Sequence, residues 1–74
     1  MKYEPLLTLI NERKKKGLSR HDLALLSKIT EETIKSLEYG INNPRQAKLS
    51  TLLALCEALK INLSVLFPDE KRIK

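Results

Sequence analysis

Cysteine is nearly absent from this 74-residue sequence, since Cys56 is the only one, and no disulfide can form within the chain. Histidine is equally rare, and His21 and Cys56 are the only classical soft metal ligands. Two such ligands are too few for a structural zinc site, so we expect no metal. A lone thiol also fits a reducing compartment, and we expect a cytoplasmic protein.

Long apolar runs are missing as well. No stretch approaches the roughly 20 apolar residues that a membrane span requires, so we expect no membrane association. The N-terminus also lacks a basic segment followed by an apolar run and a small-residue cleavage site, which is the pattern of a secretory signal.

Aromatic and glycine residues are few. Tyr3, Tyr39 and Phe67 are the only aromatic residues, which argues against a platform that stacks unpaired bases. The two glycines stand apart, so there is no glycine-rich phosphate loop. No Ser/His/Asp or Cys/His arrangement is indicated, and the carboxylates lack a paired catalytic context. We therefore expect neither an enzyme, nor a cofactor, nor a small-molecule ligand.

Positive charge is in excess, with 14 Lys and Arg residues against 9 Asp and Glu residues and a net charge of +5. On so small a chain this excess favours polyanionic partners without identifying nucleic acid. The length predicts one domain near the lower limit for folding without disulfides or metals. Oligomerisation commonly stabilises domains of this size.

Apolar residues recur at helical spacing along almost the whole chain, and strand-type alternation is absent. We predict an all-α domain over residues 1–68, followed by a polar C-terminal tail over residues 69–74. The predicted helices cover about residues 5–16, 19–27, 30–39, 47–59 and 63–67. The fourth helix has a wide apolar face that contains Leu49, Leu52, Leu53, Cys56 and Leu59.

Helix-start residues support two of these boundaries. Ser19 and Asp22 have the spacing of a capping box, with Asp in place of the usual Glu. Thr30 is a favourable N-cap, and Glu31 and Glu32 follow it in the first turn, where negative charge is stabilising.

Only about two residues, Lys28 and Ile29, separate the second and third predicted helices. Two helices joined by so short a turn cross steeply, which is the helix-turn-helix arrangement. The sequence around this turn resembles the lambda-repressor-like, Cro-type helix-turn-helix family, also called the XRE family. The matching positions are Leu18, Ser19, Leu23, Ala24, Ile29, Thr30, Thr33, Ile34, Leu37, Glu38, Gly40, Asn43 and Pro44.

The resemblance extends through residues 58–67, which are similar to the last two helices of the family, so it covers about residues 6–67. It implies a compact five-helix bundle. It also implies a small transcription regulator that binds double-stranded DNA sequence-specifically. The recognition helix would be Thr30–Tyr39, lying in the major groove.

By position in the family, two groups of residues are implied at the DNA. Those nearest base edges are Thr30, Glu31, Glu32, Thr33, Lys35 and Ser36. Those near phosphates are Ser19, Arg20, Tyr39, Asn42, Asn43, Arg45 and Lys48. The adjacent carboxylates Glu31 and Glu32 have two interpretations: one accepts from cytosine N4, or both serve only to stabilise the helix start.

The family pattern also implies a structural salt bridge between Arg13 and Glu38 that orients the recognition helix, the alternative being two exposed side chains. Lys28 stands where the family usually has Gly, and a left-handed backbone there would cost Lys on the order of 1 kcal/mol. We expect His21 to be exposed and without a role, and Cys56 to be a small core residue.

One recognition helix makes few base contacts, so we expect a homodimer on a palindromic operator, acting as a repressor. The candidate dimer interface is Leu63, Val65, Leu66 and Phe67, the alternative being that only Val65 is exposed and the others close the core.

Leu25 and Leu26 either pack under Tyr3 and Leu7 or form a partner surface. A protein-interaction adaptor or antitoxin module on the same fold is the competing function.

Overall fold

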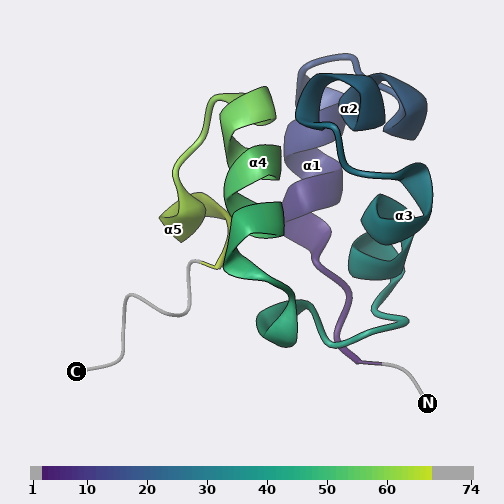
Figure 1. Ribbon diagram of the computed structural model, residues 1–74. Coiled ribbons are helices and arrows are strands. Elements are labelled where there is room, and N and C mark those ends of the chain that lie inside the picture. Colours follow the sequence, from purple (N-terminus) through teal and green to yellow (C-terminus); the bar gives the residue numbers. More distant parts are fainter. Residues whose placement is uncertain (1–2, 68–74) are drawn as a thin grey trace.

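The computed structural model of the chain describes residues 3–67, apart from the side chain of Arg45 (Figure 1). The predicted polar tail, residues 69–74, lies outside this part. The described residues form five α-helices and one short 3-10 helix, η1, and contain no strand. The all-α, five-helix prediction is therefore confirmed. The elements are α1 (Leu7–Lys15), α2 (Arg20–Ser27), α3 (Glu31–Tyr39), η1 (Pro44–Gln46), α4 (Leu49–Leu59) and α5 (Leu63–Leu66).

Short-range side-chain bonds set where α2 and α3 begin. The Ser19 hydroxyl accepts from the Asp22 backbone N–H at 3.0 Å, and the Ser19 N–H donates to the Asp22 carboxylate at 3.1 Å. The capping box predicted for this pair is therefore present. At the start of α3, the Thr30 hydroxyl accepts from the Thr33 N–H at 3.2 Å. These bonds satisfy N–H groups that a helix start otherwise leaves without a partner.

Two predicted helix starts differ from the structure. The first helix begins at Leu7 rather than Pro5, because the preceding backbone bonds to the end of α3 instead, with Leu6 N donating to Leu37 O at 3.2 Å. The fourth helix begins at Leu49 rather than Ala47, because Pro44–Gln46 forms η1 first.

One hydrophobic core joins all five α-helices. The buried apolar residues are Leu6, Leu9, Leu23, Ile34, Leu37, Leu52, Leu55, Cys56, Leu59, Leu66 and Phe67. Helix α2 packs on both α3 and α4, and α1 packs on α3 and α5. Ala24 is half-buried against this core, which is consistent with a small residue where helices approach closely. Cys56 is buried as expected, and its burial raises the pKa of the thiol.

Several leucines expected in the core or beneath other side chains lie on the surface. Leu49 and Leu53 on α4 are 58% and 47% exposed, so the apolar face predicted for this helix is too wide. Leu25 and Leu26 on α2 are 66% and 59% exposed, so they do not pack beneath Tyr3 and Leu7. The buried stripe of α2 contains Leu23 and Ser27, four residues apart, and leaves the intervening leucines outside.

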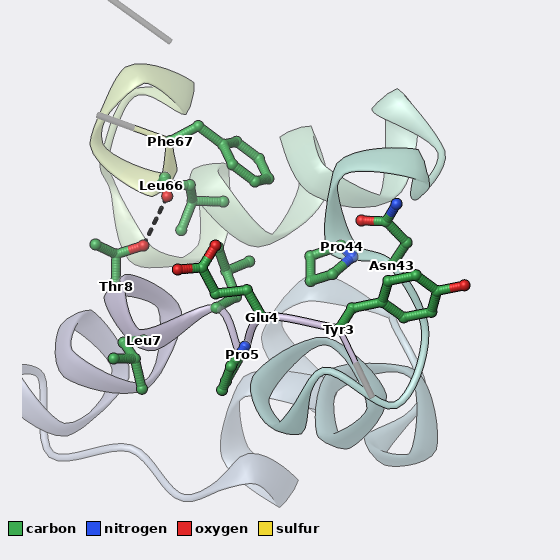
Figure 2. A pocket seen from close by; sticks show the side chains of 10 residues that line it. Tyr3, Glu4, Pro5, Leu7, Thr8, Asn43, Pro44, Leu66 and Phe67 are labelled. Atoms are coloured by element: carbon green, nitrogen blue, oxygen red, sulfur yellow. Dashed lines mark hydrogen bonds between the residues drawn. The ribbon is translucent and has the colours of Figure 1, made fainter. Parts of the chain in front are cut away.

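The predicted dimer residues on α5 are divided by burial. Leu66 and Phe67 are 1% and 9% exposed, and the Thr8 hydroxyl donates to Leu66 O at 2.7 Å, which fastens α5 to α1 (Figure 2). Leu63 and Val65 are half-buried. Leu66 and Phe67 therefore close the core, and Leu63 also packs against it from its half-buried position, as the alternative had it. Val65, which the alternative left exposed, is half-buried.

In the part of the chain that the structure describes, no helix has the length and apolar character needed to cross a membrane.

Candidate nucleic-acid interface

The interface is organised by the packing of α3 on its two neighbours. Ile34, Leu37 and Glu38 form the buried face of α3, while the opposite face is directed to solvent. Figure 1 shows α3 at the edge of the bundle, away from α4 and α5. A helix held in this way presents one full face to a partner, and the width of the DNA major groove matches such a helix.

The turn between α2 and α3 is fixed by two features. The Ser27 hydroxyl donates to Leu23 O at 2.7 Å and accepts from the Ile29 N–H at 3.2 Å. Lys28 has a left-handed backbone with a φ of 62°, as anticipated for the position where the family usually has Gly. The crossing of the two helices is therefore set by the backbone and one buried hydroxyl.

The predicted ion pair between Arg13 and Glu38 is present and buried. Arg13 Nε donates to Glu38 Oε2 at 2.7 Å and Arg13 Nη2 donates to Oε1 at 3.3 Å, while Nη1 donates to Leu18 O at 2.9 Å. The Glu38 side chain is 1% exposed. Because α1 thereby holds the last turns of α3, this bidentate pair restricts rotation of α3.

Arg20 extends the same network toward the surface. Its Nε lies 3.4 Å from Glu38 Oε1, its Nη2 donates to the Tyr39 hydroxyl at 3.1 Å, and its guanidinium lies 5.2 Å from the centre of the Tyr39 ring. The family pattern places both Arg20 and Tyr39 near phosphates. Their mutual contact was not predicted, since the two positions lie on different helices.

The six base-contact candidates fall into two sets. Thr30, Glu31 and Thr33 already have side-chain partners within the protein: the two threonine hydroxyls lie 2.9 Å apart, and Glu31 Oε2 lies 2.8 Å from His21 Nδ1. The other three form no side-chain hydrogen bond or ion pair with another described residue; they are Glu32, Lys35 and Ser36.

His21 corrects one expectation. Its side chain is 66% exposed, as expected, but it forms an ion pair with the first residue of α3 when protonated and therefore has a partner. The contact was missed because it joins α2 to α3 across the turn, and only the packing of the two helices brings the residues together.

A groove with a volume of about 670 Å³ runs beside α3. One wall carries Glu32, Thr33 and Ser36, and the other carries Asn42, Asn43, Gln46 and Lys48 from the loop and η1. Predicted base-contact and phosphate-contact residues are thus brought to the same groove. Gln46 and Thr51 also line it and were not predicted. The side chain of Arg45 lies outside the described part.

Electrostatically, the interface is mixed. Lys35 and Lys48 are exposed close to the acidic start of α3, while Ser19 opens α2 nearby with its hydroxyl already used by the cap. The Ser19 backbone N–H and hydroxyl lower the pKa of Asp22, so this carboxylate remains charged as part of the capping box. Among residues 3–67, no cluster of three or more His, Cys, Asp and Glu side chains has the arrangement needed to hold a metal.

Comparisons with known proteins agree with this geometry. The family described as Helix-turn-helix matches residues 9–66. The crystal structure of the restriction-modification controller protein C.AhdI from Aeromonas hydrophila is similar, with a TM-score of 0.74 and 34% sequence identity over 82% of this chain and 88% of that chain. No curated protein matches the chain. The chain therefore belongs to the helix-turn-helix family of the XRE type and is a DNA-binding transcription regulator.

Proposed function

We propose that the chain binds a two-fold symmetric duplex operator as a homodimer, places α3 in the major groove, and represses transcription there. The observation that carries this proposal is the outward face of α3. On it, Glu32, Lys35 and Ser36 have no side-chain partner among the described residues. A carboxylate, an ammonium group and a hydroxyl match the donors and acceptors of base edges in the major groove.

Phosphate contacts on both sides of α3 complete the proposed docking. The loop and the start of α4 supply Asn42 and Lys48. The start of α2 supplies the backbone N–H groups of its first turn beside Ser19, whose own N–H and hydroxyl are bonded within the capping box. Arg20 is positioned by Tyr39 and Glu38, so its guanidinium is held in one place before DNA arrives. Ordered side chains lose less conformational entropy on binding than mobile ones.

Two features support the proposed dimer: the few base pairs that one helix can read, and the apolar side chains at the surface of α4 and α5. One helix reads too few base pairs for tight specificity, whereas two helices on a palindrome double the contacts. Leu49 and Leu53 are exposed on α4, and Leu63 and Val65 are half-buried on α5, the helix that packs on α4. We assign the contact between copies to these four residues, which we call the α4–α5 surface, and exclude Leu66 and Phe67.

The proposed context of regulation rests on the similar structure, and the proposed direction, repression, rests on the fold of the described residues. The Aeromonas protein is a restriction-modification controller. Small proteins that resemble this family include phage or plasmid repressors, restriction-modification controllers and antitoxins, and the similar structure favours a controller. Repression is favoured because the described residues form a single helical domain in which we assign no separate activating surface.

Selection of duplexes from a random pool tests the proposal directly. We expect enrichment of a palindrome whose half-sites are about one helical turn apart. Binding to the selected duplex should weaken steeply with salt as counterions are released. The same affinity for every duplex, or no retention at low salt, would contradict the proposal. A strong asymmetric site would contradict only the dimer.

A second candidate is a protein-interaction adaptor or antitoxin module on the same fold. The observation in its favour is the pair Leu25 and Leu26, both largely exposed on α2. The two functions separate with matched variants. Lys35→Glu and Lys48→Glu should weaken DNA binding and leave adaptor binding unchanged, whereas Leu25→Ser with Leu26→Ser should do the reverse. Arg20 is unsuitable for this comparison, because its reversal would disturb the buried Glu38.

A further inference from the structure

Two adjacent carboxylates open the recognition helix, and the structure treats them differently. Glu31 Oε2 lies 2.8 Å from His21 Nδ1, which belongs to the first turn of α2. The partners are on different helices, so the contact fixes the direction of the Glu31 carboxylate relative to α2.

Glu32 is the same residue type one position later, but its surroundings differ. It is exposed, it has no side-chain partner among residues 3–67, and it lines the groove beside α3 together with Ser36. Consecutive residues of an α-helix point about 100° apart. The two carboxylates therefore face different surroundings, although both stand at the start of α3.

We propose that His21 is a positioning residue for operator recognition: it holds Glu31 toward α2 and leaves Glu32 as the carboxylate that reads bases. This inference rests on the proposed function and deepens it. Glu32 accepts from a base amino group, for which cytosine N4 is the usual partner of a carboxylate in the major groove. Lys35 lies three residues further along α3, on the same side, and donates to guanine O6 or N7.

The charge balance near the phosphates gives this arrangement a physical reason. Two free carboxylates facing a polyanion repel it, whereas a carboxylate bonded to an imidazole N–H presents less negative charge to the phosphates. The contact is exposed, with 66% of the His21 side chain and 55% of the Glu31 side chain accessible, so in the free protein it adds little stability. Its proposed consequence is therefore for base preference and not for folding.

Base preferences of four variants, each measured by selection from a random duplex pool, test the inference. His21→Ala releases Glu31, and we expect a changed preference, by about tenfold or more, at a base pair that the wild-type chain reads weakly. His21→Asn places an amide N–H close to the position of Nδ1, and we expect it to restore the wild-type preference. His21→Ala combined with Glu31→Ala should lose the new preference, and Glu32→Gln should flatten the cytosine preference.

The outcomes separate this inference from the function on which it rests. If His21→Ala selects the wild-type site, or if His21→Asn behaves like His21→Ala, the positioning role is wrong while sequence-specific binding stands. If Glu32→Gln keeps the full cytosine preference, Glu32 is not the reader. If the wild-type chain enriches no duplex, both the inference and the proposed function fail. Thermal unfolding of each variant verifies that the exposed substitutions leave the fold intact.

Discussion

Arg13 and Glu38 meet across 25 residues of sequence as a buried bidentate pair, with Arg13 Nε 2.7 Å from Glu38 Oε2. The pair connects α1 to the last turns of α3. Arg20 Nε lies 3.4 Å from the other carboxylate oxygen, Glu38 Oε1, and forms a second, longer ion pair. The orientation of the solvent-exposed face of α3, which we propose reads DNA, therefore depends on one carboxylate that is 1% exposed.

Removing one partner of this pair should destabilise the domain strongly. Arg13→Met keeps most of the apolar stem but leaves Glu38 buried with only the longer contact to Arg20. We expect a loss of about 3–5 kcal/mol in the free energy of unfolding, measured by urea denaturation followed by circular dichroism. Arg13→Met with Glu38→Leu should lose less than the single variant, because no charge remains buried. A loss below about 1 kcal/mol for the single variant would contradict this account.

Local signals in the sequence predicted much of this fold. The features that the sequence did not predict depend on contacts between helices. The caps at Ser19 and Thr30 depend on residues three positions apart, so spacing alone reveals them. The shift of the fourth helix to Leu49 follows from η1, which no local pattern indicated. The contact between His21 and Glu31 depends on how α2 rotates against α3, and that rotation is set by packing.

Two lysines occupy left-handed backbone positions at helix ends, which predicts stabilising substitutions. Lys28 and Lys60 have φ values of 62° and 59°. A side chain with a Cβ costs about 1–2 kcal/mol there, partly offset by the greater freedom of Gly in the unfolded chain. We expect Lys28→Gly and Lys60→Gly each to raise Tm by a few degrees. Lys16→Gly is the control, since Lys16 ends α1 at a φ of −91°, and it should give no gain.

The two glycines have similar backbones but different neighbours, and the same substitution should separate them. Gly17 and Gly40 have φ values of 69° and 72°. A Cβ on Gly17 would meet no atom within 4 Å, whereas one on Gly40 would collide with the backbone oxygen of Tyr3. We expect Gly17→Ala to cost about 1 kcal/mol and Gly40→Ala to cost at least about 2 kcal/mol more, measured by chemical denaturation. Equal losses would show that the residue 3–6 segment does not pack against the end of α3.

The capping box at the start of α2 predicts how stability changes in acid. The Ser19 N–H bond holds the pKa of Asp22 below its ordinary value in the folded state. The folded state therefore binds fewer protons, and this contribution is present above about pH 4 and lost as the pH falls through the lowered pKa. Thermal unfolding at intervals from pH 6 to pH 2 should show Asp22→Asn less stable than wild type near pH 6, with the difference closing in acid. A difference that stays constant with pH would contradict the assignment.

The α4–α5 surface predicts which leucine controls assembly. Leu53 on α4 and Leu25 on α2 are both exposed, at 47% and 66%, so neither substitution removes a core side chain. If copies meet through the α4–α5 surface, Leu53→Asn buries a polar group in the contact and should weaken dimerisation about tenfold or more. Sedimentation equilibrium across micromolar concentrations measures this effect, with Leu25→Asn as the matched control that keeps the wild-type constant. If both variants weakened dimerisation equally, the contact would lie elsewhere. If the wild-type chain were a monomer throughout that range, the proposal of a dimer in the absence of DNA would be wrong.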